Sequence, residues 1–145
     1  RSAMRNLRCA DLVVDVLAAI LLNIGPASAG EDGPYLFEQL KHSTYLTSFK
    51  AIFQGQTHLE PWLKEYIRTR NGVDMPGTTQ VINDQTYSVH EVCQPHNCPG
   101  NVLYVLFTPA GGRAYALFTK DDGSQRFFGN PDTTLQEALL HRARQ

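Results

Sequence analysis

The stretch that decides the fold is Val102-Leu103-Tyr104-Val105-Leu106-Phe107. It is a continuous apolar run of strand length, without the polar alternation of a half-buried strand. Such a run is typical of a strand that is buried on both faces. The segment Pro109-Ala110-Gly111-Gly112 follows it and predicts a turn. We therefore place residues 102–107 at the centre of a sheet.

The segments on either side show the period of two that is typical of strands. Upstream, Asn83-Asp84 separates two alternating segments and predicts a hairpin. Downstream, Asp121-Asp122-Gly123 predicts another turn. All connections are short enough for antiparallel neighbours. The five predicted strands are 79–82, 86–92, 102–107, 113–119 and 125–128.

Helical spacing of apolar residues appears at both ends of this strand-rich region. Residues 35–54 carry apolar side chains at intervals of three and four, with a break expected near His42-Ser43. A second helix is expected from Glu60-Pro61 to about Thr69, and a last one over 134–144. The sequence therefore predicts an α+β domain, with about five antiparallel strands and the helices packed on one side.

The first thirty residues are of a different kind. A basic start at Met4-Arg5 is followed by an apolar run over 12–24 and by Ala27-Ser28-Ala29. This pattern is typical of a secretory signal peptide. We expect residues 1–29 to be the signal, with residues 1–3 a cloning scar, and residues 30–145 to form a single domain.

An amphipathic helix is the alternative interpretation of this segment. Asp11 and Asp15 would lie on one face of such a helix, four residues apart. Asp15 also interrupts the apolar run of the predicted signal. Both interpretations stay open at this point.

The composition excludes several classes of protein. The chain has 145 residues, 42% of them hydrophobic and 19% charged, and a formal net charge of −1. This excludes a disordered tail and a basic nucleic-acid binder. No phosphate-binding loop, nucleophile elbow or paired-carboxylate pattern is recognisable, so we expect neither an enzyme nor a bound cofactor.

The residues best suited to binding or reaction lie between two predicted strands, in Cys93-Gln94-Pro95-His96-Asn97-Cys98. Removal of the signal takes Cys9 with it and leaves these two cysteines. In an oxidising compartment we expect Cys93 and Cys98 to form a disulfide. Pro95 restricts the backbone further. The result would be a stiff, protruding, disulfide-closed loop with His96 near its tip.

Three interpretations of this loop compete. It can be a hairpin turn held by the disulfide, in which His96 is a solvated surface residue without a function. It can be a metal site of Cys93, His96 and Cys98, which requires reduced cysteines and lacks a fourth ligand at zinc spacing. It can be a recognition loop that enters the cleft of a partner, since a preordered loop loses little entropy on binding. The residues alone do not decide among them.

The pattern Cys-x-Pro-His-x-Cys resembles the signature of the Ivy family, inhibitors of vertebrate lysozyme from Gram-negative bacteria. Weaker similarities occur in the right order over most of residues 35–144. They are Leu36-Phe37-Glu38-Gln39-Leu40, Ala51-Ile52-Phe53-Gln54-Gly55, Pro61-Trp62 and the strand that contains Tyr87.

The resemblance implies a function without catalysis. It implies that the loop enters the active-site cleft of a c-type lysozyme, where His96 hydrogen-bonds the two catalytic carboxylates. Cys93 and Cys98 would rigidify the loop, in which Gln94, Pro95 and Asn97 fill the other positions. Gln94 departs from the family, in which lysine is common. The remaining hypothesis is an exported metal-binding protein.

The resemblance also bears on location and partners. It implies export to the periplasm, with lysozyme as a protein partner. We expect no nucleic acid, no membrane span and no cofactor. The oligomeric state, monomer or homodimer, stays open.

Overall fold

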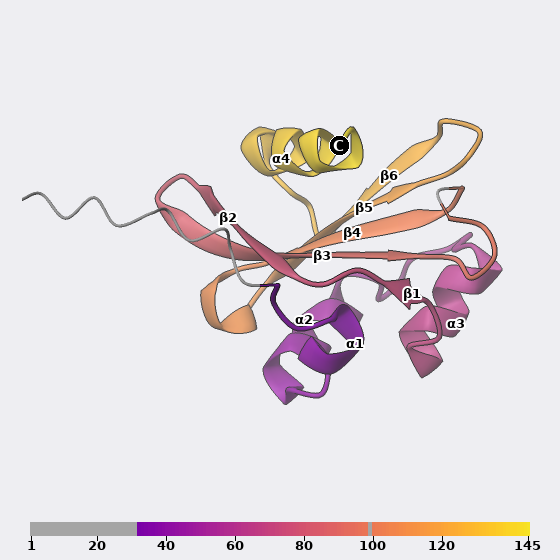
Figure 1. The fold of residues 1–145 in the computed structure, drawn as a ribbon, viewed down its shortest axis with the longest axis horizontal. Coiled ribbons are helices and arrows are strands. Elements are labelled where there is room, and N and C mark those ends of the chain that lie inside the picture. Colours follow the sequence, from indigo (N-terminus) through magenta and orange to yellow (C-terminus); the bar gives the residue numbers. More distant parts are fainter. Residues whose placement is uncertain (1–31, 99) are drawn as a thin grey trace, which may run out of the picture.

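The computed structural model describes residues 32–98 and 100–145, and the signal peptide predicted over 1–29 lies outside them. The described chain is an α+β domain in which a twisted antiparallel sheet lies between two layers of helices (Figure 1). Its helices are α1 (Leu36–Gln39), α2 (Ser43–Ala51), α3 (Pro61–Thr69) and α4 (Thr133–Ala143), with one 3₁₀ turn, η1 (Pro109–Gly111). Its strands are β1 (Val73–Asp74), β2 (Thr78–Ile82), β3 (Gln85–Cys93), β4 (Val102–Phe107), β5 (Ala114–Thr119) and β6 (Gln125–Phe128).

The predicted α+β class and the five predicted strands are confirmed, with bounds that differ by one residue or not at all. The spatial order of the sheet is β1-β3-β4-β5-β6, and β2 pairs with the same edge of β3 as β1 does. All these pairs are antiparallel. Hairpins at Asn83-Asp84 and Asp121-Asp122-Gly123 join their neighbours as the turn residues predict.

Strand β4 is the centre of the fold. All six of its residues are buried, as expected of an apolar run without alternation. The side chains on its two faces belong to two separate clusters of buried residues. Leu103, Val105 and Phe107 join residues of α1, α2 and α3. Val102, Tyr104 and Leu106 join Leu135 and Leu139 of α4.

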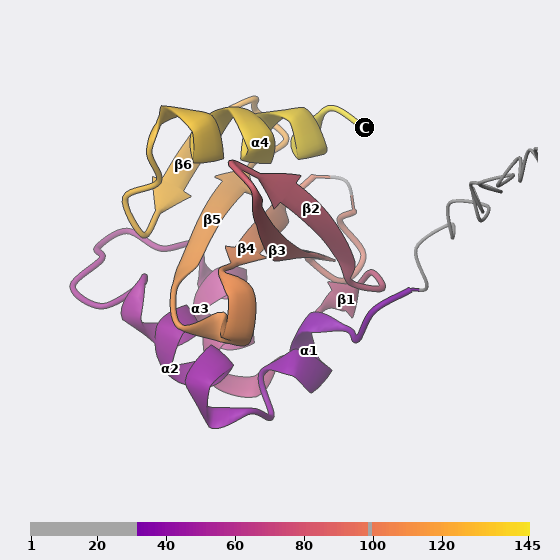
Figure 2. The ribbon, with the colours of Figure 1, turned by 90° about the vertical axis from the view of Figure 1, so that its left-hand side faces the viewer.

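The expectation that all helices pack on one side of the sheet is wrong. Figure 2 shows α4 above the sheet and α1, α2 and α3 below it. The physical reason is the apolar run itself, because a strand buried on both faces needs a cover on each face. Leu135 and Leu139, four residues apart on α4, provide that cover on the second face.

The helical region 35–54 is broken near His42-Ser43, as predicted. Helix α1 ends at Gln39, and α2 begins at Ser43 with His42 as an extended N-cap residue. Every helix within 32–98 and 100–145 is too short or too polar to cross a membrane.

Strand β1 was not predicted, since residues 71–77 are typical of a loop by composition. Val73 pairs with Cys93, and Asp74 pairs with Val92. The Asp74 carboxylate accepts a hydrogen bond from the Tyr66 hydroxyl at 2.9 Å, and burial raises the pKa of this carboxyl group. This pairing brings β1 beside the end of β3 from which the cysteine loop leaves.

Candidate functional site: a disulfide-closed loop

The loop over 93–101 is held by the two central strands of the sheet. Cys93 is the last residue of β3 and pairs with Val102, the first residue of β4. The predicted disulfide between Cys93 and Cys98 is confirmed, with 5.5 Å between the two Cα atoms. Cys93 is buried in the core between the sheet and α4, whereas Cys98 is exposed. The disulfide therefore ties the loop to the core.

Backbone hydrogen bonds fold the loop further. The Gln94 amide donates to the Asn101 carbonyl at 3.0 Å, the Asn101 amide to the Asn97 carbonyl at 3.1 Å, and the Asn97 amide to the Gln94 carbonyl at 3.0 Å. These bonds link both arms of the loop to its turn. They restrict its backbone independently of the disulfide.

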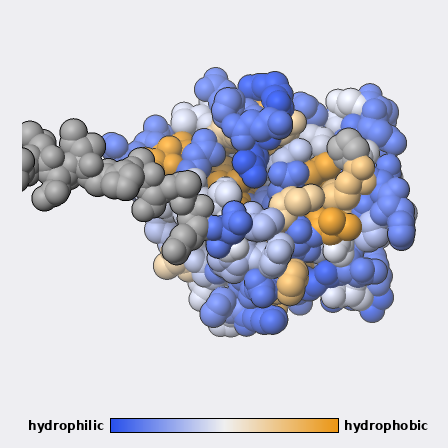
Figure 3. Space-filling view, in the orientation of Figure 1, coloured by the Kyte–Doolittle hydropathy of each residue, from blue (hydrophilic) through white to orange (hydrophobic). Residues whose placement is uncertain are grey.

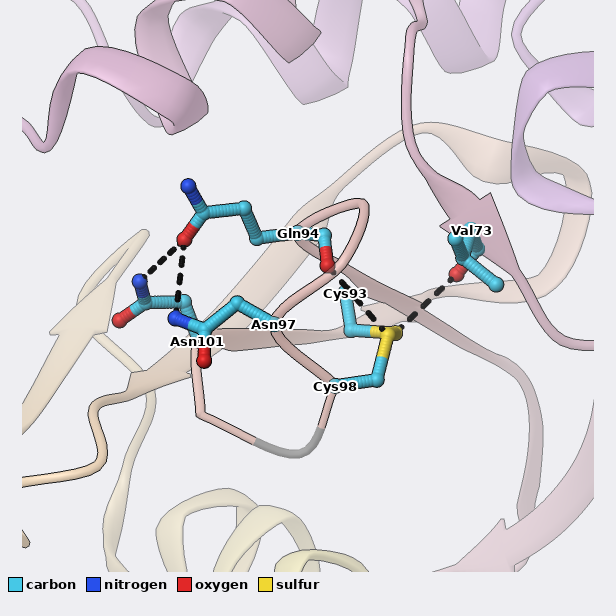
Figure 4. The surroundings of a disulfide bond; sticks show 6 residues. All are labelled: Val73, Cys93, Gln94, Asn97, Cys98 and Asn101. Carbon is cyan, nitrogen blue, oxygen red and sulfur yellow. Dashed lines mark hydrogen bonds between the residues drawn. A yellow bond between two sulfur atoms is a disulfide. The ribbon is translucent and has the colours of Figure 1, made fainter.

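The Gln94 side chain stabilises the loop through hydrogen bonds to two other loop residues. Its Oε1 atom accepts from the side-chain amides of Asn97 at 3.2 Å and Asn101 at 2.5 Å (Figure 4). A lysine at this position would have no acceptor and could not make these bonds. In this protein Gln94 therefore contributes an internal contact.

His96 is the exposed residue at the turn of the loop. Its φ is 62°, in the left-handed region that costs most residues about 1–2 kcal/mol. Within residues 32–98 and 100–145 its ring makes no hydrogen bond to another side chain or to the backbone. The loop thus holds a solvent-facing imidazole in a fixed backbone conformation.

The structure distinguishes among the predicted loop residues. Gln94, Pro95 and Asn97 are half-buried, and the side-chain amides of Gln94 and Asn97 face each other. Of the four predicted contact residues over 94–97, only His96 presents a polar side chain that is exposed and free of such contacts.

Sequence reasoning missed two neighbours of the loop. Asn101 completes the amide network, and the Val73 carbonyl oxygen lies 3.6 Å from Cys93 Sγ. Asn101 is a single polar residue before strand β4. Val73 lies next to the loop because it pairs with Cys93, which is twenty residues further along the chain. Neither carries a local sequence signal.

The disulfide argues against the predicted metal site, because Cys93 and Cys98 cannot serve as thiolate ligands while they are bonded to each other. Zinc and copper bind cysteine as the thiolate, and both sulfurs of the loop are in the disulfide. Among the residues that the structure describes, no group of three His, Cys, Asp or Glu side chains is placed to hold a metal ion.

These features define a class of protein: a small α+β domain whose central strands hold an exposed, disulfide-closed loop. The chain belongs to the Ivy family, inhibitor of vertebrate lysozyme, whose family model matches residues 55–142. The matched region includes the whole cysteine loop, and it confirms the family resemblance found in the sequence.

Two named relatives agree with the family match, and a third similar protein is uncharacterized. The chain is 28% identical over 137 residues to the inhibitor of vertebrate lysozyme of Pseudomonas aeruginosa, covering 86% of each chain. It is 24% identical over 109 residues to the protein of that name in Escherichia coli K12, covering 75% of this chain and 64% of that one. An uncharacterized protein of Yersinia pestis is 29% identical over 77 residues, covering 52% of this chain and 46% of its own length.

Removal of the disulfide should lower stability modestly. In the chain-entropy model, closing a ring of about six residues contributes roughly 2 kcal/mol. We therefore expect the Cys93→Ala/Cys98→Ala variant to lose roughly 2 kcal/mol of unfolding free energy in urea titrations. Reductant should destabilise the parent protein by a similar amount and leave the variant unchanged. A parent protein that is insensitive to reductant would contradict this expectation.

Proposed function

We propose that this protein is an exported inhibitor of c-type lysozyme, and that the loop over 93–98 enters the active-site cleft of the enzyme. Family membership and the names of two relatives support the target class. The presentation of His96 supports the mode of binding. The observation that carries the proposal is an exposed imidazole on a loop closed by a disulfide and by three backbone hydrogen bonds.

The target chemistry suits an imidazole. A retaining glycosidase such as lysozyme has two carboxyl groups about 5–5.5 Å apart in its cleft. A neutral imidazole donates one hydrogen bond and a protonated one donates two. In a cleft from which water is excluded, hydrogen bonds to ionised carboxylates are among the strong ones. His96 would therefore occupy the position of the glycosidic bond and contact both catalytic groups.

Inhibition in this scheme involves no chemical step. The loop presents no sugar to the enzyme, so no bond is cleaved, and the inhibitor needs neither a nucleophile nor a cofactor of its own. Rigidity adds to the affinity, because a loop that is already folded loses little conformational entropy on binding. The disulfide and the Gln94 amide contacts supply that rigidity.

The proposed location is the periplasm. The signal-like pattern over 1–29 supports export, and export supports disulfide formation between Cys93 and Cys98. A lysozyme that penetrates the outer membrane would meet the inhibitor there.

A turbidity assay tests the proposal. Purified protein at micromolar concentration should slow the lysis of cell-wall substrate by a c-type lysozyme in a dose-dependent manner. A cell-wall hydrolase with an unrelated active site is the control, and its rate should not change. Unchanged lysis by the c-type enzyme, with no free thiol titrated in the mature chain that lacks Cys9, would contradict the proposal.

A further inference from the structure

We infer that Val73 and Met75 form an apolar patch that packs against the rim of the same lysozyme cleft when the loop enters it. We call these two residues the β1 patch. This inference rests on the proposed function and extends the binding surface beyond the loop.

The β1 patch lies directly beside the loop. Val73 pairs with Cys93, and its carbonyl oxygen lies 3.6 Å from Cys93 Sγ. The Met75 amide donates to the Glu91 carbonyl at 2.9 Å, which continues the same edge. Figure 3 shows hydrophobic side chains gathered at the end of the molecule where β1 and the loop lie.

Both residues of the β1 patch are exposed apolar side chains. Val73 is 42% exposed and Met75 is 36% exposed, although residue 74 between them points inward, with its carboxylate on Tyr66. Alternation places positions 73 and 75 on the same face of the strand. Beside the patch, Glu91 and Arg142 form an ion pair at 3.7 Å. An apolar centre with a charged border is the usual anatomy of a protein-binding surface.

The size of a stable interface requires more than the loop. A specific protein–protein interface buries about 800 Å² on each partner and involves roughly 20–30 residues a side. The cysteine loop over 93–98 has only six residues, and Cys93 among them is buried. A partner whose cleft receives this loop must therefore also contact the surface around the loop. Strand β1 is part of that surface, because it pairs with β3 at the base of the loop.

The same observations favour lysozyme over a second copy of this chain as the occupant. Association of two copies through sheet edges needs a continuous row of free backbone groups, and this edge is divided between β1, with two residues, and β2, with five. The patch offers side chains instead of a long backbone edge. The β1 patch is adjacent to the loop, so the lysozyme that binds His96 can contact it as well.

Val81 provides a matched control. It is a valine on the same open edge, in β2, and it is 68% exposed. Val81 pairs with Thr86, whereas Val73 pairs with Cys93. At about 3.3 Å per strand residue, the two valines lie roughly 23 Å apart along β3.

The experiment measures the dissociation constant of the complex with c-type lysozyme for five proteins, which are the parent, His96→Ala, Val73→Asp, Val73→Thr and Val81→Asp. Val73→Asp should weaken binding by at least about tenfold, because it places a charge in an apolar contact. Val73→Thr keeps the branched shape and strand preference, so it tests the lost methyl group without risk to the fold. It should weaken binding severalfold. Val81→Asp should bind within about twofold of the parent.

The outcomes separate this inference from the proposed function. Parent-like binding by both Val73 variants, in a protein whose His96→Ala variant binds weakly, would overturn the β1 patch alone. A parent protein that does not bind lysozyme would overturn both. If sedimentation shows that Val73→Asp dissociates a dimer while lysozyme binding is unchanged, the occupant is a second copy and the inference is wrong.

Discussion

Replacement of His96 by alanine should weaken the inhibition of c-type lysozyme by about 30-fold or more. That factor corresponds to a binding free energy of ~2 kcal/mol, the lower limit for an interface hot spot. The effect should be large because the substitution removes the polar side chain that the loop exposes at its turn. In the complex it would leave both catalytic carboxylates desolvated without their partner.

The alanine variant changes two things, and a second variant separates them. At φ 62° alanine is strained, so His96→Ala also disturbs the backbone of the loop. Asparagine tolerates the left-handed region and keeps a donor, although it is shorter and cannot carry a charge. If contact with both carboxylates matters, His96→Asn should also bind much more weakly than the parent. Recovery of full inhibition in His96→Asn would mean that loop shape, and not the imidazole, carries the binding.

His58 is the matched control for this experiment. It is also an exposed histidine with a left-handed backbone, at φ 56°, in the segment before α3. His58→Ala therefore imposes the same change of residue type and a similar strain outside the loop. It should inhibit as the parent does, with inhibition constants measured against the same lysozyme preparation. An equal loss in both variants would contradict a specific role for His96.

The second large effect concerns a different histidine, and it is one of stability. His90 on β3 is only 1% exposed, and its ring packs edge-on against Phe107 with 5.6 Å between ring centroids. Neither ring nitrogen has a hydrogen-bond partner among the described residues. Burial lowers the pKa of His90 to about 4 from its ordinary value of 6.5, because the charged imidazolium would lose its hydration.

This pKa shift predicts the direction of the pH dependence. The unfolded chain binds a proton at His90 below about pH 6.5, whereas the folded protein binds it only near pH 4. The contribution of the neutral ring to stability is therefore complete above pH 6.5 and is lost as the pH falls toward 4. Over that window the unfolding free energy should drop by about 3 kcal/mol through this group.

Urea titrations at several pH values check this expectation. The His90→Leu variant replaces the imidazole with an apolar side chain of similar size that fits the same environment. It should lose much less stability than the parent between pH 6.5 and 4, and the two curves should separate most at the acid end. Parallel curves would show that the acid sensitivity arises elsewhere. Hydrogen bonds from Ser124 lower the pKa of the exposed Asp122 carboxyl group from its ordinary value of 3.8, so its contribution to stability is lost only below this pH window.

The two histidines illustrate what local sequence can and cannot predict. His96 is flanked by Pro95 and bracketed by two cysteines, so its place on a closed loop follows from neighbouring residues alone. His90 sits in an alternating strand, where the next residue faces the other side. Its burial depends on Phe107 and Gly77, which approach through strand pairing and chain reversal. A Cβ at Gly77 would lie 2.9 Å from His90 Cε1, so only the folded chain shows how tightly the ring is enclosed.

The sequence by itself determined the positions of β2 to β6, the break between α1 and α2, the disulfide pair and the candidate histidine. These features depend on apolar period, turn residues and cysteine spacing, which act over a few residues. Only the tertiary structure decided that α4 covers the second face of β4, that β1 pairs beside the loop, and that Gln94 braces it through Asn101. These are contacts between segments that folding brings together, and local patterns do not encode which segment will supply the partner.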